Sequence, residues 1–140
     1  ELFDAVDIDP SYIDKADRVL VDAPCTGLGI IRRKPDIKWT RMEKDLEIIP
    51  DLQIKILNAA SKYVKPNGVL VYSTCTIEPL ENIEVVNKFL RFNNSFSLEG
   101  IDNLLPDKLV NQTGSKGYIQ LYPDMDGMDG FFIAKLRRKN

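Results

Sequence analysis

Two cysteines stand in matching local settings and could act together on one ligand. Cys25 lies in the stretch V-L-V-D-A-P-C-T and Cys75 in V-L-V-Y-S-T-C-T, so each follows a Val-Leu-Val segment and precedes a threonine. A thiolate is a strong nucleophile, and a covalent bond to a substrate splits one difficult reaction step into easier ones. The matching placement therefore favours a site with two thiols over two unrelated side chains.

Other interpretations of the cysteines remain open. Most free cysteines are small, buried hydrophobic side chains, and a pair could also form a disulfide, which is typical of small secreted domains. The chain has no histidine, which excludes a Cys-His catalytic pair within it and zinc sites of the Cys-His type. We expect no metal site.

The elements that position the cysteines are predicted from the apolar pattern. Residues 18–22 and 68–73 are short apolar runs without polar alternation, as expected of parallel strands covered on both faces. Between them, the capping-box spacing of Thr40 and Glu43 predicts a helix start near Thr40. Pro50 suits the first turn of a second helix, and residues 65–68 are predicted to stop it.

A further helix is predicted after the second strand, with Pro79 in its first turn and its end at Asn93 and Asn94. Its inner face is expected to contain Leu80, Ile83, Val86 and Leu90, and its outer face Glu81, Glu84, Lys88 and Arg91. Residues 97–115 look irregular, and 118–122 and 131–136 look like strands joined by a loop over 124–130. This order predicts one domain with an open α/β sheet of parallel strands, finished by a terminal antiparallel strand pair.

Ligands of open α/β sheets bind beyond the carboxyl ends of the strands, so we expect both cysteines at that rim. Asp22 ends the first strand, and Pro24 stiffens the loop that follows. Gly27 and Gly29 would let the backbone approach a ligand closely.

Composition and charge set limits on the kind of protein. The chain has 140 residues, of which 44% are hydrophobic and 29% charged, an ordinary globular balance. No apolar run approaches the roughly 20 residues that would span a membrane, and no signal-peptide pattern is present, so we expect a cytoplasmic protein. The net charge of −2 argues mildly against nucleic-acid binding. One stretch is nevertheless strongly basic, and it is either a solvated surface or a contact for RNA; it contains Arg32, Arg33, Lys34, Lys38 and Arg41.

The longer motifs resemble a known family. The block Asp22-Ala23-Pro24-Cys25-Thr26-Gly27-Leu28-Gly29, continued by Ile31-Arg32-Arg33-Lys34-Pro35-Asp36-Ile37-Lys38-Trp39, resembles motif IV of the RNA cytosine-5 methyltransferases. Ser73-Thr74-Cys75-Thr76 resembles motif VI of the same family. The likeness is closest to the type that modifies bacterial 16S ribosomal RNA. It covers nearly the whole chain and includes Leu52-Gln53, Glu81-Asn82 and Asp129-Gly130-Phe131-Phe132.

This resemblance implies a class I, Rossmann-like methyltransferase that uses S-adenosyl-L-methionine, with residues 1–140 as the C-terminal half of that domain. The glycine-rich cofactor loop would lie upstream, so we expect the isolated chain to be inactive. The strand at Val19 would expose an edge that could associate with another chain. The cofactor-binding residues implied are Asp22, Pro24 and Asp4, with Asp7 or Asp9 as alternatives to Asp4.

The resemblance also implies roles in rRNA modification. Cys75 would be the nucleophile, Cys25 would assist elimination of the product, and Asp22 would contact the cytosine. A helix beginning after Thr76 would lower the pKa of the Cys75 thiol. The basic residues Arg32, Arg33, Lys34 and Lys38 would hold the RNA backbone, while Trp39 would either stack on a base or pack against the domain.

Three other functions compete with this interpretation. A DNA cytosine-5 methyltransferase would need only one of the two thiols. An amino methyltransferase would have an aromatic residue where this chain has Cys25. A non-catalytic RNA- or ribosome-binding fragment, or a degenerate methyltransferase module, would need neither thiol.

Overall fold

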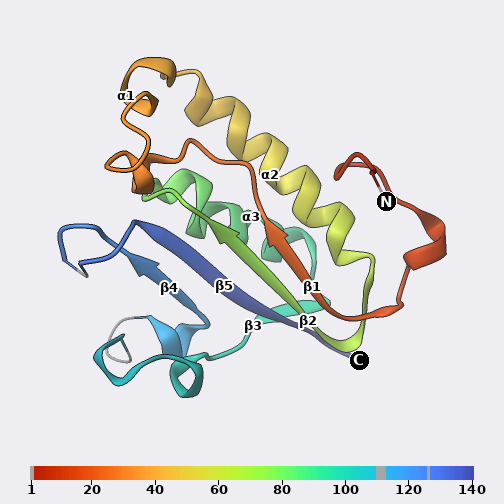
Figure 1. The fold of residues 1–140 in the computed structure, drawn as a ribbon. Coiled ribbons are helices and arrows are strands. Elements are labelled where there is room, and N and C mark those ends of the chain that lie inside the picture. The colour runs from red at the N-terminus through yellow and green to blue at the C-terminus, as the bar shows by residue number, and fades with distance from the viewer. Residues whose placement is uncertain (1, 110–112, 126) are drawn as a thin grey trace.

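A computed structural model describes residues 2–109, 113–125 and 127–140, and within them one mixed sheet forms the centre of the fold (Figure 1). The strands are β1 (Ala16–Asp22), β2 (Val64–Thr74), β3 (Phe96–Leu98), β4 (Tyr118–Leu121) and β5 (Phe131–Arg138). The α-helices are α1 (Ile37–Thr40), α2 (Asp45–Ser61) and α3 (Ile83–Phe92). Short 3-10 helices cover Pro10–Tyr12, Leu28–Ile30, Pro79–Glu81, Asp102–Leu104, Asp107–Leu109 and Gly114–Lys116.

The sheet has the predicted architecture. Its strand order is β1-β2-β5-β3, with β4 also paired to β5. The pair β1 and β2 is parallel, whereas β5 runs antiparallel to β2, β3 and β4. An open α/β sheet with an antiparallel addition is therefore confirmed. Strand β3 was not expected, because it lies at the edge of a segment that looked irregular.

The sheet separates two clusters of buried side chains. Successive residues of a strand point to opposite faces, and on β5 Phe132 joins the main core while Ile133 packs against the smaller one. The main core is formed with α2 and α3, which lie on the same face (Figure 1). The smaller core lies under the segment between β3 and β4 and contains Ile101, Leu109 and Ile119.

Strand β1 is an exposed edge, as predicted. It pairs with β2 alone within the described residues. Leu20 is 67% exposed, although Val21 beside it is buried in the main core. The expectation that this strand is covered on both faces is therefore wrong, since one of its faces is open.

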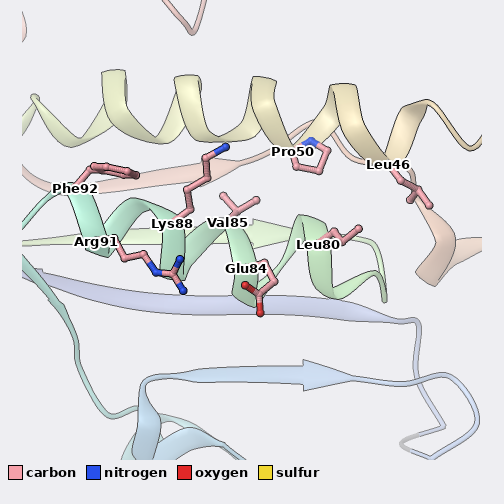
Figure 2. Close-up of a pocket in the computed structure, with 8 residues that line it drawn as sticks. All are labelled: Leu46, Pro50, Leu80, Glu84, Val85, Lys88, Arg91 and Phe92. Atoms are coloured by element: carbon pink, nitrogen blue, oxygen red, sulfur yellow. The ribbon is translucent and has the colours of Figure 1, made fainter.

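The helix before β2 differs from the prediction. Thr40 ends α1 instead of beginning a helix, and α2 begins at Asp45, whose carboxylate accepts a hydrogen bond from the Met42 N–H at 3.0 Å. Pro50 lies inside α2 and not in a first turn. It points toward α3 (Figure 2) and lines a groove of about 450 Å³ together with Leu46 and Phe92.

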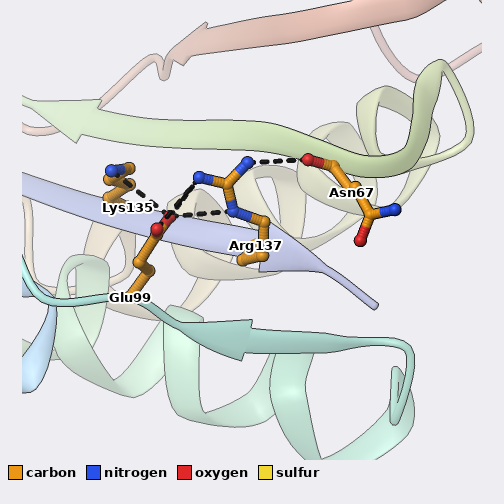
Figure 3. A network of polar contacts seen from close by, with 4 residues as sticks. All are labelled: Asn67, Glu99, Lys135 and Arg137. Carbon is orange, nitrogen blue, oxygen red and sulfur yellow. Dashed lines mark hydrogen bonds and ion pairs between the residues drawn. The ribbon is translucent and has the colours of Figure 1, made fainter. Parts of the chain in front are cut away.

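The turn expected over residues 65–68 is a bulge within β2. Ala16 pairs with Val64 and Arg18 with Val69, so four residues of β2 lie opposite Asp17 alone. Within the bulge, Asn67 has a positive φ of 62° and its carbonyl accepts a hydrogen bond from Arg137 at 2.6 Å (Figure 3). The helix stops earlier than predicted, at Ser61.

Arg137 also ties β5 to the segment after β3. Its guanidinium makes two hydrogen bonds to the Glu99 carboxylate, at 2.9 and 3.0 Å (Figure 3). Lys135 lies 3.2 Å from the same carboxylate. These contacts lower the pKa of Glu99, with the hydrogen bond from Arg137 as the main cause.

A break at Asn82 changes the orientation of the segment before α3. The 3-10 helix Pro79–Glu81 precedes it, and Asn82 has the non-helical angles φ −109° and ψ −101°. Glu81 is therefore fully buried and Leu80 is 48% exposed, the reverse of the prediction. Because the α-helix begins only after this break, a helical periodicity counted from Pro79 assigns Leu80 and Glu81 to the wrong faces. Beyond it the prediction holds, since Val86 is buried, Glu84 is exposed and the helix ends before Asn93.

Candidate active site

The two thiols meet at the carboxyl ends of β1 and β2. The Sγ atoms of Cys25 and Cys75 lie 3.3 Å apart, and both side chains are half-buried. The strands bring them together because Asp22 pairs with Ser73, and the Ala23 N–H donates to the Ser73 carbonyl at 2.9 Å. A disulfide bond would be about 2.05 Å long, and both cysteines are free. The expectation that both cysteines lie at this rim of the sheet is confirmed.

This contact makes the two thiols chemically different. The hydrogen bond from Cys25 lowers the pKa of Cys75 to about 7, and Lys34 adds a smaller favourable field. The same hydrogen bond, followed by burial, raises the pKa of Cys25. Near neutral pH the proton therefore stays on Cys25, while about half of Cys75 is present as the thiolate, the reactive form of cysteine.

The cause of this lowered pKa differs from the one expected. No α-helix starts directly after Thr76, because the chain first forms the 3-10 helix Pro79–Glu81 and α3 begins only at Ile83. The neighbouring thiol supplies the effect that a helix terminus was expected to supply.

A buried polar cluster lies beneath the thiols. The hydroxyl oxygens of Thr26 and Thr76, the residues that follow the two cysteines, are 2.9 Å apart. Both hydroxyls contact the Glu81 carboxyl group, which also accepts the Thr26 N–H at 2.8 Å. The Gln53 amide nitrogen bonds to Glu81 at 3.1 Å and to the Pro24 carbonyl at 2.9 Å.

Sequence reasoning assigned no site role to this cluster. Glu81 was placed on the outer face of a helix. The signals that could have revealed the cluster were the threonine after each cysteine and the match of Gln53 and Glu81 to family positions.

Two glycines allow three loops to meet beside Cys75. A Cβ added at Gly29 would lie 2.1 Å from the Gly130 carbonyl oxygen and 2.8 Å from that of Cys75. The Gly29 N–H donates to the Cys75 carbonyl at 3.1 Å, and the Gly130 N–H to the Gly29 carbonyl at 2.8 Å. The close approach expected of Gly29 is thus made to neighbouring backbone.

Two of the residues expected to bind cofactor, Asp22 and Pro24, lie beside the edge strand β1. Asp22 accepts a hydrogen bond from the Ser73 hydroxyl at 2.9 Å. Asp22 and Pro24 line a hollow of about 350 Å³, together with Asp7 on the N-terminal segment. Asp4 does not line this hollow, and its carboxylate accepts the Val6 N–H at 3.1 Å. Asp9 caps the 3-10 helix at Pro10.

The basic stretch is partly engaged within the chain. Arg32 and Arg33 both form ion pairs with Asp129, in the loop before β5. Arg41 donates to the carbonyls of Thr26 and Cys25, at 2.9 and 3.1 Å.

The remaining members of this stretch face solvent. Lys34 and Lys38 are exposed, and Trp39 is 85% exposed, so it does not pack against the domain.

Two absences concern the described part of the chain. None of its helices combines the length and apolar character that crossing a bilayer requires. Among the same residues, no group of three or more histidine, cysteine, aspartate or glutamate side chains could hold a metal ion.

Comparison with solved structures defines the class of protein. The crystal structure of PH0851 superposes with a TM-score of 0.80 at 32% identity, over 90% of this chain and 27% of that one. NSun6 from Pyrococcus horikoshii, solved with SFG, gives 0.69 at 34% identity, over 86% of this chain and 29% of that one. The fold is therefore that of the Rossmann-like, S-adenosylmethionine-dependent methyltransferases.

Sequence comparison defines the family. The model of the 16S rRNA methyltransferase RsmB/F family matches residues 3–137, and the chain belongs to this family. The probable ribosomal RNA small subunit methyltransferase B of Bacillus subtilis is 42% identical over 127 residues, which is 90% of this chain and 28% of that protein. The Pasteurella multocida methyltransferase B is 46% identical over 122 residues, 87% of this chain and 26% of that protein. The chain thus spans little more than a quarter of these relatives.

Proposed function

We propose that this chain contributes the reaction centre of an enzyme that methylates carbon 5 of a cytosine in 16S ribosomal RNA. The observation that carries the proposal is the 3.3 Å contact between two free thiols at the carboxyl ends of parallel strands. Because the chain spans only part of its relatives, the activity is proposed for the longer protein. The 140 residues alone are proposed to be the inactive C-terminal half of its catalytic domain.

In the first step, the Cys75 thiolate adds through Sγ to carbon 6 of the cytosine. The new S–C6 bond moves the electron pair of the C5=C6 double bond toward carbon 5, which becomes nucleophilic. S-adenosyl-L-methionine, when bound, supplies the electrophilic methyl group that carbon 5 takes up. A pKa of about 7 for Cys75 supports this role, since roughly half of the thiol is ionised at neutral pH.

In the second step, Cys25 removes the proton from carbon 5. The C5=C6 double bond then re-forms and the S–C6 bond breaks, which returns Cys75 as a thiolate. The contact between the thiols explains how Cys25 can hold a proton in the first step and act as a base in the second. Its hydrogen bond to the Cys75 thiolate raises the pKa of Cys25. Once Cys75 is bonded to carbon it is no longer anionic, so Cys25 can release its own proton to solvent and then accept the proton from carbon 5.

Asp22 and Pro24 are proposed to face both base and cofactor. The Ser73 hydroxyl fixes one oxygen of Asp22 and leaves the other for the cytosine edge. The hollow beside them has apolar walls and a second carboxylate, Asp7, which suits a ligand that carries both an aromatic ring and a positive charge. For the acidic residue near the adenine, this placement favours Asp7 over our expectation of Asp4.

RNA is proposed to approach over the loop that contains Cys25. Lys34 and Lys38 are exposed there and can neutralise phosphates. Trp39 can stack on an unpaired base. Arg32 and Arg33 could join them only after their ion pairs with Asp129 rearrange.

The proposal is tested by replacing each thiol in the full-length protein. Cys75→Ala is expected to abolish both methylation and the covalent protein–RNA adduct. Cys25→Ala is expected to leave addition possible but slow elimination, so that the adduct accumulates on denaturing gels. Adduct formation by Cys75→Ala would show that the nucleophile is assigned wrongly. RNA binding without adduct or methylation in the wild-type protein would instead indicate a non-catalytic RNA-binding module.

A further inference from the structure

The polar cluster beneath the thiols repeats their pairing one residue further along the chain. Cys25 and Cys75 face each other with sulfurs 3.3 Å apart, and Thr26 and Thr76 face each other with hydroxyl oxygens 2.9 Å apart. The thiol pair is half-buried, whereas both threonines are at most 1% exposed. The outer pair is therefore open to a ligand and the inner pair is sealed.

One carboxyl group holds the inner pair together. Oxygen Oε1 of Glu81 contacts the Thr26 hydroxyl, and lies 3.4 Å from that of Thr76. Oxygen Oε2 accepts the Thr26 N–H at 2.8 Å and the Gln53 amide at 3.1 Å. The Thr26 hydroxyl donates to Glu81. Thr76 can then donate to either of them.

The burial of Glu81 is unusual for a side chain that only packs. The residue is fully buried, and none of the ion pairs among the described residues involves it. A buried carboxyl group is costly unless its surroundings satisfy it. Here the partners come from the loops after β1 and β2 and from α2, so the group connects the three segments that surround the thiols.

We propose that Glu81 is a positioning residue that sets the distance between Cys25 and Cys75 by clamping the threonines that follow them. Its consequence for methylation rests on the function proposed above, but the clamp itself does not. If the clamp loosens, the loops can separate and the thiol contact lengthens. Cys75 then loses the hydrogen bond that stabilises its thiolate.

The backbone around Glu81 is fixed independently of its carboxyl group. The Tyr72 hydroxyl donates to the Glu81 carbonyl at 2.7 Å. The Asn82 amide donates to the Thr76 carbonyl at 3.0 Å, and its side-chain oxygen accepts from the Thr74 hydroxyl. Glu81→Gln is therefore expected to fold, because it keeps these bonds and the shape of the side chain. The substitution replaces one accepting carboxyl oxygen by an NH2 group, which can only donate. This NH2 group faces either the Thr26 N–H and the Gln53 amide, which are themselves donors, or the hydroxyls of Thr26 and Thr76.

The test measures Cys75 directly in the full-length protein. Alkylation by iodoacetamide is followed from pH 5.5 to 9.5 under reducing conditions, and peptide mass spectrometry separates Cys75 from Cys25. For Glu81→Gln we expect the midpoint of the Cys75 profile to rise by about one pH unit. The kcat for methylation should fall while the KM for RNA changes little. Glu84→Gln, an exposed glutamate on α3, is the matched control and should leave the profile unchanged.

A second pair of variants decides the matter if Glu81→Gln does not fold by circular dichroism. Thr76→Val removes the hydroxyl at nearly constant volume and should raise the midpoint, whereas Thr76→Ser keeps the hydroxyl and should restore it. The clamp is disproved if a folded Glu81→Gln, or Thr76→Val in its place, gives the wild-type profile. Because alkylation needs neither RNA nor cofactor, a wild-type protein that does not methylate would refute the proposed function and leave this result valid.

Discussion

The two ends of the central parallel strands use polar side chains in opposite ways. At the end where β1 and β2 begin, charges neutralise one another at the surface: Lys65 pairs with Asp17, Arg138 with Asp14, and Arg137 with Glu99. At the end where these strands finish, the Glu81 carboxyl group is buried among neutral hydrogen-bond donors, and the sulfurs of Cys25 and Cys75 are hydrogen-bonded to each other beside it.

This difference separates structural from chemical use of polar groups. An exposed ion pair contributes about 0–1 kcal/mol, and all three of those pairs are partly exposed. Their charges are already matched, which leaves little to offer a ligand. At the thiol end, the Cys75 thiolate is stabilised only while Cys25 keeps its proton and donates it in a hydrogen bond. A ligand that bonds to Cys75 removes that negative charge, and the pKa of Cys25 then changes as well.

The largest effect should follow from removing the Cys25 thiol, which would leave Cys75 to titrate like an ordinary free cysteine. Without the hydrogen bond from Cys25, the pKa of Cys75 should rise from about 7 toward the free-thiol value of about 8.5. A thiolate is present above its pKa and lost below it. At pH 7, Cys25→Ala should therefore alkylate at Cys75 roughly tenfold more slowly than the wild-type protein.

A serine at the same position sharpens this test. Cys25→Ser keeps a hydroxyl that can donate, so its midpoint should lie between those of the wild-type protein and Cys25→Ala. If the Cys75 midpoint stays near pH 7 in Cys25→Ala, the two ends of the strands do not differ in the way proposed here, and another group lowers the pKa of Cys75.

A smaller effect should follow from a change beside the thiols that leaves both in place. In Gly29→Ala the new Cβ would lie 2.1 Å from the Gly130 carbonyl oxygen, and backbone has to move to admit it. Overpacking of this kind costs about 1–3 kcal/mol, which urea unfolding would measure. The Cys75 alkylation profile should shift as well, because the Cys75 carbonyl lies 2.8 Å from the same Cβ.

Gly100→Ala is the matched control for this substitution. An added Cβ there meets nothing closer than 3.4 Å, the Ser115 carbonyl oxygen. It should leave both the unfolding curve and the alkylation profile almost unchanged. A Gly29→Ala protein with wild-type stability would mean that the loops do not meet as tightly as described.

The thiol site could be predicted from sequence because its position depends on a repeated local pattern. Val-Leu-Val before each cysteine identified two neighbouring parallel strands, and parallel strands end at the same edge of a sheet. That argument placed Cys25 and Cys75 at the same rim, whereas their 3.3 Å contact is a finding of the structure. The motifs that resemble the methyltransferase family added the chemistry that we propose for the pair.

The clamp beneath the thiols could not be predicted in the same way, because its position depends on a break in helical phase. Counting from Pro79 put Glu81 on the outer face, and nothing in the sequence marked Asn82 as the point where the chain turns. The opposite end of the strands was missed for a similar reason. Residues 65–68 looked like an ordinary turn, but they form the bulge opposite Asp17 that shifts the pairing register between β1 and β2.

The smallest effect should come from the end where charges are matched. Arg137→Ala removes both hydrogen bonds to Glu99 and the one to the Asn67 carbonyl, yet Lys135 remains 3.2 Å from the Glu99 carboxylate. Because these groups are partly exposed, we expect a loss of about 1 kcal/mol or less in the free energy of unfolding, measured in urea. Added salt should reduce this loss further, since it screens the pair. The Cys75 alkylation profile should match that of the wild-type protein. A shifted profile would mean that the two ends of the strands are coupled, and that the sheet transmits strain from the bulge to the thiols.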